Sequence, residues 1–182
     1  MHPALFYLPG ERLSQPELSA ARIDGHVVEI GEGYIPADLV ESPQARAAGL
    51  AALIIPGLAA SGPSAAWVHG AGDRPPLRHH AHRAVPHRVR APQSARLAFH
   101  DTALEDHEML WIGGIAVATP LRTMIDLLLG IHRDATLAVW AEALLEVLPP
   151  LLDEAGVALQ SMHRVPGSRA ARAEVDRLKR RL

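Results

Sequence analysis

The most regular pattern of apolar positions lies in the middle of the chain, over residues 113–129. It begins with Ile115 and Val117, two β-branched residues two positions apart, as on the buried face of a strand. Thr119-Pro120 follows, a helix N-cap with proline at the first helical position, where the missing N–H costs nothing. Apolar residues then recur at the spacing of a buried helical stripe: Leu121, Met124, Ile125, Leu128 and Leu129. The segment predicts a strand, a tight turn and a buried helix at the centre of the core.

The N-terminal part of the pattern predicts a helix followed by a hairpin. Ser14 is a suitable N-cap for a helix over residues 15–23, and short strands over residues 26–30 and 33–35 flank the turn Gly31-Glu32-Gly33. A helix leading into a glycine-tipped hairpin is the second half of a winged helix. Too few residues precede it to supply the two helices of the first half.

The hairpin carries two carboxylates, Glu29 and Glu32, where a DNA-binding wing normally presents basic or polar groups. Two interpretations stay open: a shortened winged helix that contacts DNA, or a hairpin that docks on the rest of the chain or joins two copies. In either case we divide the chain into a partial winged-helix-like segment, residues 1–42, and a larger α/β domain with a helical C-terminal part, residues 43–182.

Proline and glycine separate the elements that follow residue 42. Helices are predicted over residues 43–53, 61–69, 120–129, 137–148 and 151–162, and from Ser168 onward; strands are predicted over residues 77–83, 96–100, 109–112 and 115–117. The expected fold class is α+β: a truncated winged-helix-like helix–hairpin, then a small mixed or antiparallel sheet packed with helices, then a helical C-terminus.

The composition narrows the type of protein. Apolar residues make up 48% of the 182 residues, enough for a sizeable core, and the absence of cysteine excludes disulfides and thiolate metal sites. No basic segment leads into a long apolar run, and the most apolar window, residues 49–60, is too short to span a membrane. We expect a cytoplasmic protein.

The charges are segregated along the chain. Residues 69–100 contain six Arg, six His and one acidic residue, and residues 164–182 contain seven Lys or Arg against two acidic residues, whereas residues 1–68 and 101–163 are acidic. Two interpretations stay open: a positive surface that attracts phosphates, or neutralisation of the basic segments by the acidic ones. The candidate DNA-binding residues are Arg22, Arg78, His80, His82, Arg83, Arg88, Arg90, Arg169, Arg172, Lys179 and Arg180.

Two groups of residues are candidates for chemistry. On a strand, Arg78, His80 and His82 share a face. A metal site is disfavoured because arginines surround the histidines and no carboxylate lies within the run, so two interpretations stay open: phosphate contact or an ordinary solvated sheet face. Arg122 and Asp126 lie four apart on the central helix and form, with Thr119 and Pro120, a structural anchor. We therefore expect no catalytic residue, no metal and no cofactor.

The order of four motifs carries a family resemblance. They are Gly31-Glu32-Gly33-Tyr34 in the hairpin, Ser-Ala-Ala-x-x-His-Gly from Ser64 to Gly70, the arginine-rich strands, and Gly-Ile-x-Val-x-Thr-Pro-x-Arg-Thr-x-x-Asp-Leu from Gly114 to Leu127. In this order they resemble the AbiEi family, the antitoxins of bacterial type IV toxin–antitoxin and abortive-infection loci. The resemblance covers most of residues 14–130.

The resemblance implies an N-terminal winged helix that binds operator DNA and represses its own operon. It also implies a larger domain needed for antitoxicity, and a toxin encoded nearby, similar to nucleotidyltransferases, that is countered without a stable complex. The chain is thus interpreted as a non-enzymatic, antitoxin-like DNA-binding regulator, expected as a homodimer. Two alternatives stay open: a degenerate family member acting as an interaction module, and a nuclease-related domain, which the single lysine, Lys179, disfavours.

Overall fold

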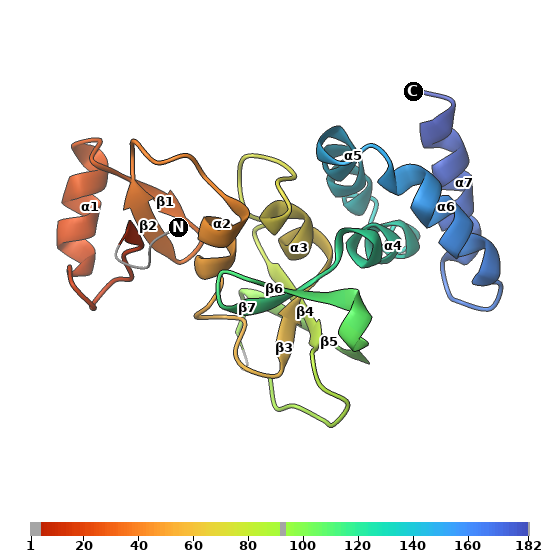
Figure 1. Ribbon diagram of the computed structural model, residues 1–182, viewed down its shortest axis with the longest axis horizontal. Coiled ribbons are helices and arrows are strands. Elements are labelled where there is room, and N and C mark those ends of the chain that lie inside the picture. Colours follow the sequence, from red (N-terminus) through yellow and green to blue (C-terminus); the bar gives the residue numbers. More distant parts are fainter. Residues whose placement is uncertain (1–4, 92–93, 182) are drawn as a thin grey trace.

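The computed structural model describes residues 5–91 and 94–181, and Figure 1 shows a central sheet between an N-terminal helix–hairpin and a C-terminal group of helices. The five strands of the sheet are β3 (Leu58–Ala60), β4 (His79–Arg83), β5 (Leu97–Ala103), β6 (Met109–Ile112) and β7 (Ile115–Ala118), and the hairpin consists of β1 (Val27–Ile30) and β2 (Gly33–Pro36). The helices are α1 (Gln15–Ile23), α2 (Pro43–Ala48), α3 (Gly62–Val68), α4 (Pro120–Gly130), α5 (Leu137–Val147), α6 (Leu151–Ser161) and α7 (Ser168–Lys179), with a short 3-10 helix η2 (Asp106–Glu108).

The central sheet is mixed. Its strands lie in the order β5-β4-β3-β7-β6. β3 pairs with β7 and β4 pairs with β5 in parallel, whereas β3–β4 and β6–β7 are antiparallel. Together with the helices that follow β7, this arrangement confirms the expected α+β class, the mixed sheet and the helical C-terminus.

The central strand β3 is the element that the apolar pattern does not predict. Its three residues, Leu58, Ala59 and Ala60, include no β-branched side chain, and alanine favours helix locally. They form a strand because β4 and β7 pair with them on both sides, and all three are buried. The helix predicted over residues 43–53 is also shorter than expected. It ends at Ala48, and residues 49–53 form turns.

The predicted central helix is confirmed as α4, and it joins two apolar cores. Thr119 caps it by accepting a hydrogen bond from the Arg122 N–H at 3.3 Å. Its Met124 and Leu128 are fully buried and belong to the core of the C-terminal helices, where α4 contacts α5, α6 and α7. On its other side α4 contacts α3, which packs against the sheet. Among the described residues, no helix is long and apolar enough to cross a membrane.

The N-terminal hairpin docks on the rest of the molecule at its tip. Glu32 donates its backbone N–H to the carbonyl of Gly49 at 2.8 Å, and its carboxylate pairs with Arg96 at 2.6 Å. Gly31 lies so close to the backbone of Gly49 that a Cβ there would collide. The glycine and the carboxylate at the tip thus serve an intramolecular contact. The part of the N-terminal arm at residues 1–4 lies outside the described residues.

Candidate functional site

Three histidines share one face of the sheet. Alternation along β4 places His80 and His82 on this face, as the sequence predicts, and places His79 on the opposite face. The parallel register pairs His82 with His100 of β5, so His100 joins them. We call His80, His82 and His100 the histidine strip. His100 is not among the sequence-predicted residues, since only the pairing of β4 with β5 brings it to this position.

The rings of the histidine strip are in contact. His80 Nδ1 and His100 Nε2 form a hydrogen bond at 3.1 Å, and the ring centroids of His80 and His100 lie 5.3 Å apart, as do those of His82 and His100. Burial, assisted by the neighbouring His100, lowers the pKa of both His80 and His82 from 6.5 to about 4. Burial also lowers the pKa of His100. The strip is therefore uncharged near neutral pH.

The predicted anchor on α4 forms and includes a carboxylate that the sequence does not indicate. The Arg122 guanidinium lies between Asp126, with Nε and Oδ1 2.9 Å apart, and Glu108, with Nη1 and Oε1 2.5 Å apart. Glu108 is the last residue of η2 and enters because the chain between β5 and β6 passes the start of α4. Burial raises the pKa of Asp126 to about 6, against the opposing effect of Arg122.

The anchor and the histidine strip meet at Asp126 and His82. His82 Nε2 and Asp126 Oδ2 are 3.9 Å apart, and both side chains are largely buried. His82 Nδ1 and Asp126 Oδ2 are buried without a hydrogen-bond partner in the described residues. His82, predicted as a DNA contact, therefore faces a carboxylate of the same chain. The two residue groups that the sequence suggests separately form one continuous polar region.

The opposite face of β4 is closed by α3. His79 is 1% exposed, and its Nδ1 lies 3.1 Å from Ser64 Oγ, which also accepts the His80 backbone N–H at 2.9 Å. At the end of α3, His69 Nε2 lies 2.7 Å from the carbonyl oxygen of Ala118, and burial lowers the pKa of His69. Ser64 and His69 belong to the second motif of the resemblance and Ala118 to the fourth. These residues thus join the two motifs to each other.

The remaining basic residues predicted on the strands differ in their surroundings. Arg83 pairs with Asp101 at 2.7 Å and donates from Nη1 to the carbonyls of Val85, Pro86 and His87, so it holds the start of the loop between β4 and β5. Arg78, Arg88 and Arg90 are exposed, and in the described part of the chain none of them pairs with a carboxylate. Arg78 donates to the carbonyl of Leu97 at 3.3 Å.

The basic C-terminal helix is partly neutralised. In α7, Lys179 pairs with Asp153 of α6 at 2.6 Å, and Arg172 donates to the carbonyl of Leu159 at 3.2 Å. Arg169 and Arg180 are exposed. Arg22 lies on α1, at the opposite end of the molecule from α7 in Figure 1. The eleven predicted residues therefore lie on three separate parts of the structure and do not form one continuous positive face.

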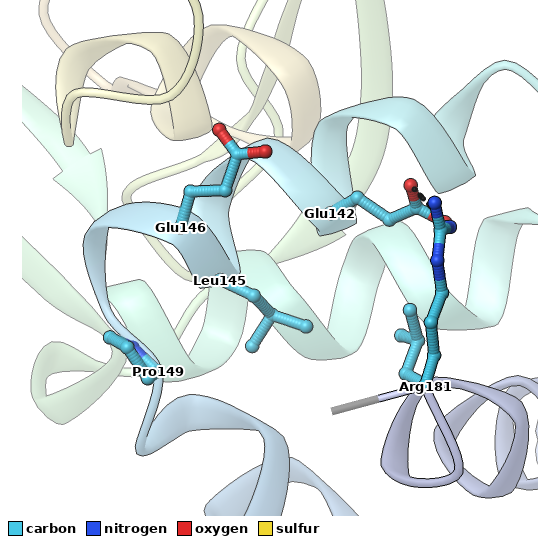
Figure 2. A pocket seen from close by; sticks show the side chains of 6 residues that line it. Glu142, Leu145, Glu146, Pro149 and Arg181 are labelled. Carbon is cyan, nitrogen blue, oxygen red and sulfur yellow. Dashed lines mark hydrogen bonds and ion pairs between the residues drawn. The ribbon is translucent and has the colours of Figure 1, made fainter.

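Two further places bear on ligand binding. Among the described residues, no three His, Asp or Glu side chains are grouped so that they could hold a metal ion. A surface pocket of about 390 Å³ lies between α5 and α7, with an apolar lining and a charged rim (Figure 2): Glu142, Leu145, Glu146, Pro149, Leu178 and Arg181. Figure 2 shows Arg181 beside Glu142, and Glu142 also pairs with Arg177 at 2.5 Å. Glu142 is thus paired with both Arg177 and Arg181, whereas Glu146 points away from Glu142 and Arg181 in Figure 2.

Comparisons with known proteins give likenesses among solved structures. No protein-family model matches the chain, and neither does any curated protein. Among solved structures, the chain is similar to the crystal structure of the RV2827C protein from Mycobacterium tuberculosis, with 16% sequence identity and a TM-score of 0.36 over 90% of this chain and 70% of that chain. A TM-score this low carries no information on function.

Proposed function

We propose that the protein is a cytoplasmic, non-enzymatic DNA-binding regulator, an antitoxin-like autorepressor of a bacterial type IV toxin–antitoxin operon. Its partners are then its own operator DNA and a nucleotidyltransferase-like toxin encoded nearby, which it counters without a stable complex. We place the DNA contact on β4, β5 and the loop between them. The observation that carries this placement is that three exposed arginines of this region, Arg78, Arg88 and Arg90, lack carboxylate partners among the described residues, whereas Arg96 pairs with Glu32.

The electrostatics of this region support contact with phosphates. Arg78, Arg88 and Arg90 are exposed cations, and counterion release from DNA makes such contacts the main source of affinity. Arg83 contributes indirectly, because its bonds to three loop carbonyls fix the backbone that leads to Arg88 and Arg90. The region thus combines exposed guanidinium groups with a backbone at residues 85–87 that Arg83 holds in place before DNA arrives, which lowers the entropy cost of binding.

The hairpin is a weaker candidate for the DNA contact. A wing needs a free tip that reaches the backbone or minor groove, and here Glu32 at the tip is paired with Arg96 and bonded to Gly49. Helix α1 offers Arg22 near its C-terminal end, and strand β1 offers the exposed Glu29. The surface that the resemblance assigns to DNA therefore carries little positive charge in this chain.

The roles of the motif residues support a non-enzymatic protein. The Ser64 hydroxyl lies next to the buried His79 and is bonded to it and to the backbone of His80 on the closed face of the sheet. Asp126 is held by Arg122, and Thr119 caps α4. A nucleophile must reach its substrate with a base beside it, and Ser64 is completely buried. The polar residues of the motifs thus serve the fold.

Salt-titrated binding to its own promoter DNA tests this function. We expect the observed association constant to fall with salt, and the double variant R88A/R90A to reduce the slope of log K against log salt by about 2, since each phosphate contact contributes about 0.9. The variant R169A/R180A, which removes two exposed arginines from α7, is the matched comparison and should keep the wild-type slope. Binding that is absent, indifferent to salt, or weakened only by the α7 variant contradicts the proposal.

A further inference from the structure

The His80–His100 pair has an unusual hydrogen-bonding capacity. Two neutral imidazoles carry one N–H each, and the bond between His80 Nδ1 and His100 Nε2 uses one of these two N–H groups. Whichever ring donates, the pair presents one N–H and one unprotonated nitrogen outside this bond. A single added proton converts that unprotonated nitrogen into a second outward donor, and the bond between the rings stays intact. The pair then carries one positive charge, and the N–H of the charged ring outside this bond is a charge-assisted donor for an oxyanion.

The surroundings of the pair favour an anion. The guanidinium groups of Arg78 and Arg133 lower the pKa of His100, and Arg78 also lowers that of His80, so both arginines act on these rings. In the described residues, neither arginine pairs with a carboxylate. One carboxylate acts in the opposite sense, since Asp134 raises the pKa of His80. The Asp134 carboxylate accepts hydrogen bonds from the backbone N–H and the hydroxyl of Thr136, at 2.9 and 2.6 Å. Two cations thus act on the pair against one carboxylate.

The third histidine of the strip does not belong to this site. His82 faces Asp126, and the next charged groups around it are Arg122 and Glu108. A carboxylate at 3.9 Å repels an incoming anion, and His82 is more deeply buried than His100. His79 is excluded because it lies on the closed face of β4 and is bonded to Ser64. Only His80 and His100 combine an outward nitrogen with nearby cations.

We propose that His80 and His100, with Arg78 and Arg133 beside them, form a site for a phosphate group of the DNA backbone that takes up one proton when the phosphate binds. This site rests on the proposed function, and it adds a pH dependence to it. Binding linked to one proton strengthens up to about tenfold for each pH unit of acidification. The two arginines attract the phosphate at every pH, and protonation of the histidine pair makes the affinity depend on pH.

The test combines a simple anion with DNA. Sulfate is a tetrahedral dianion whose charge is constant from about pH 5 to about pH 8, so any pH dependence of its binding comes from the protein. We expect sulfate to shift the imidazole ¹⁵N resonances of His80 and His100 in the NMR spectrum of the whole chain, with tighter binding at lower pH. The matched control is His107, a highly exposed histidine next to Glu105, whose resonances sulfate should leave unshifted at each pH.

The DNA arm uses the variants H100Q and H80Q/H100Q, with H107Q as control. We expect wild type and H107Q to bind duplex promoter DNA more tightly at about pH 6 than at about pH 7, by up to about tenfold. The variants H100Q and H80Q/H100Q should lose this increase while they retain salt-dependent binding. Thermal unfolding of H100Q, which changes an exposed side chain, shows whether the variant remains folded.

Each outcome decides a specific point. Unchanged His80 and His100 resonances in both sulfate and DNA overturn the site. Sulfate binding together with an unaltered pH dependence of DNA binding in the folded variants also overturns it as a DNA site, because the pair then binds free anions. DNA binding that is independent of this pair leaves the proposed function standing, whereas loss of all DNA binding in the wild type removes that function.

Discussion

The two faces of strand β4 carry adjacent histidines with opposite surroundings. His79 lies beneath α3, 1% exposed and bonded to Ser64, whereas His80 faces away from α3 and is bonded to His100. Burial lowers the pKa of both to about 4. A shifted pKa therefore does not distinguish a structural histidine from a functional one. The distinction lies in whether the second ring nitrogen has access to a ligand and in which charges surround it.

The largest loss of stability is expected at Arg122, where the face of the sheet that carries the histidine strip meets α4. Arg122→Met removes the cation between Glu108 and Asp126 and leaves two carboxylates, one of them deeply buried, without their partner. Breaking a buried ion pair from one side costs about 3–5 kcal/mol, and these partly exposed groups should give a loss near the lower end of that range. Urea unfolding measures it, and a loss below about 1 kcal/mol would show that the anchor is dispensable.

A smaller loss of stability is expected at Ser64, on the face of the sheet that α3 covers. Ser64→Ala leaves the His80 backbone N–H and the His79 ring without their shared partner, and an unsatisfied buried group costs about 1–3 kcal/mol. DNA binding of the folded variant should stay at the wild-type level, because Ser64 is fully buried under α3. A selective loss of DNA binding with unchanged stability would instead assign Ser64 to the functional face.

The pH dependence of stability separates the faces further. Three histidines have a pKa of 6.5 in the unfolded chain and of about 4 in the folded protein: His79, His80 and His82. Between these pH values the unfolded chain binds more protons than the folded protein. The free energy of unfolding therefore decreases as the pH falls from 6.5 towards 4. Asp126, with its pKa raised from 3.8 to about 6, acts in the opposite direction as the pH falls from about 6 to 3.8. Three histidines against one carboxylate predict a net loss of unfolding free energy on acidification, with each unmatched proton contributing at most about 1.4 kcal/mol per pH unit.

The variant H79Q should flatten this pH dependence even though it removes no exposed group. Unfolding at a series of pH values, compared with that of H107Q, is the measurement. A wild-type stability that rises as the pH falls from about 6.5 to about 5 would show that the histidines are protonated in the folded protein.

The smallest loss of stability is expected at the contact between the hairpin tip and Arg96. Arg96→Ala removes the pair with Glu32, and since Arg96 is 56% exposed the loss should be about 0.2–1 kcal/mol. It should also raise the pKa of His79 slightly, because Arg96 is one of the groups that lower it. The ¹⁵N titration of His79 reports this shift. Loss of the hairpin fold on this change would show that the ion pair, rather than Gly31 and Gly49, holds the tip.

Local signals predict most elements, and non-local pairing explains those that they miss. Two helices, α1 and α4, form where expected. Their signals are visible over a few residues each: the N-cap at Ser14, with Glu17 in the first turn, for α1, and the cap at Thr119 with the apolar stripe for α4. The strand β3 has no such signal, since Leu58-Ala59-Ala60 becomes a strand only between β4 and β7.

The same limit applies to the site. Alternation along β4 identifies His80 and His82, but His100 and Glu108 join them through strand register and chain path. Charge segregation indicates basic segments, yet it does not show that Arg83, Arg96 and Lys179 pair with acidic residues far away in the sequence. Side-chain surroundings decide which cations stay available, and these depend on contacts that no short segment contains.

The most direct test of the central claim is the map of DNA contacts by NMR. Addition of duplex promoter DNA to the ¹⁵N-labelled chain at low salt should shift backbone and side-chain resonances on β4, β5 and the loop that carries Arg88 and Arg90, together with Arg133, and should leave α1 and the hairpin unchanged. Shifts concentrated on Arg22, Val28 and Glu29, or on α7 alone, would place the DNA elsewhere and contradict the account.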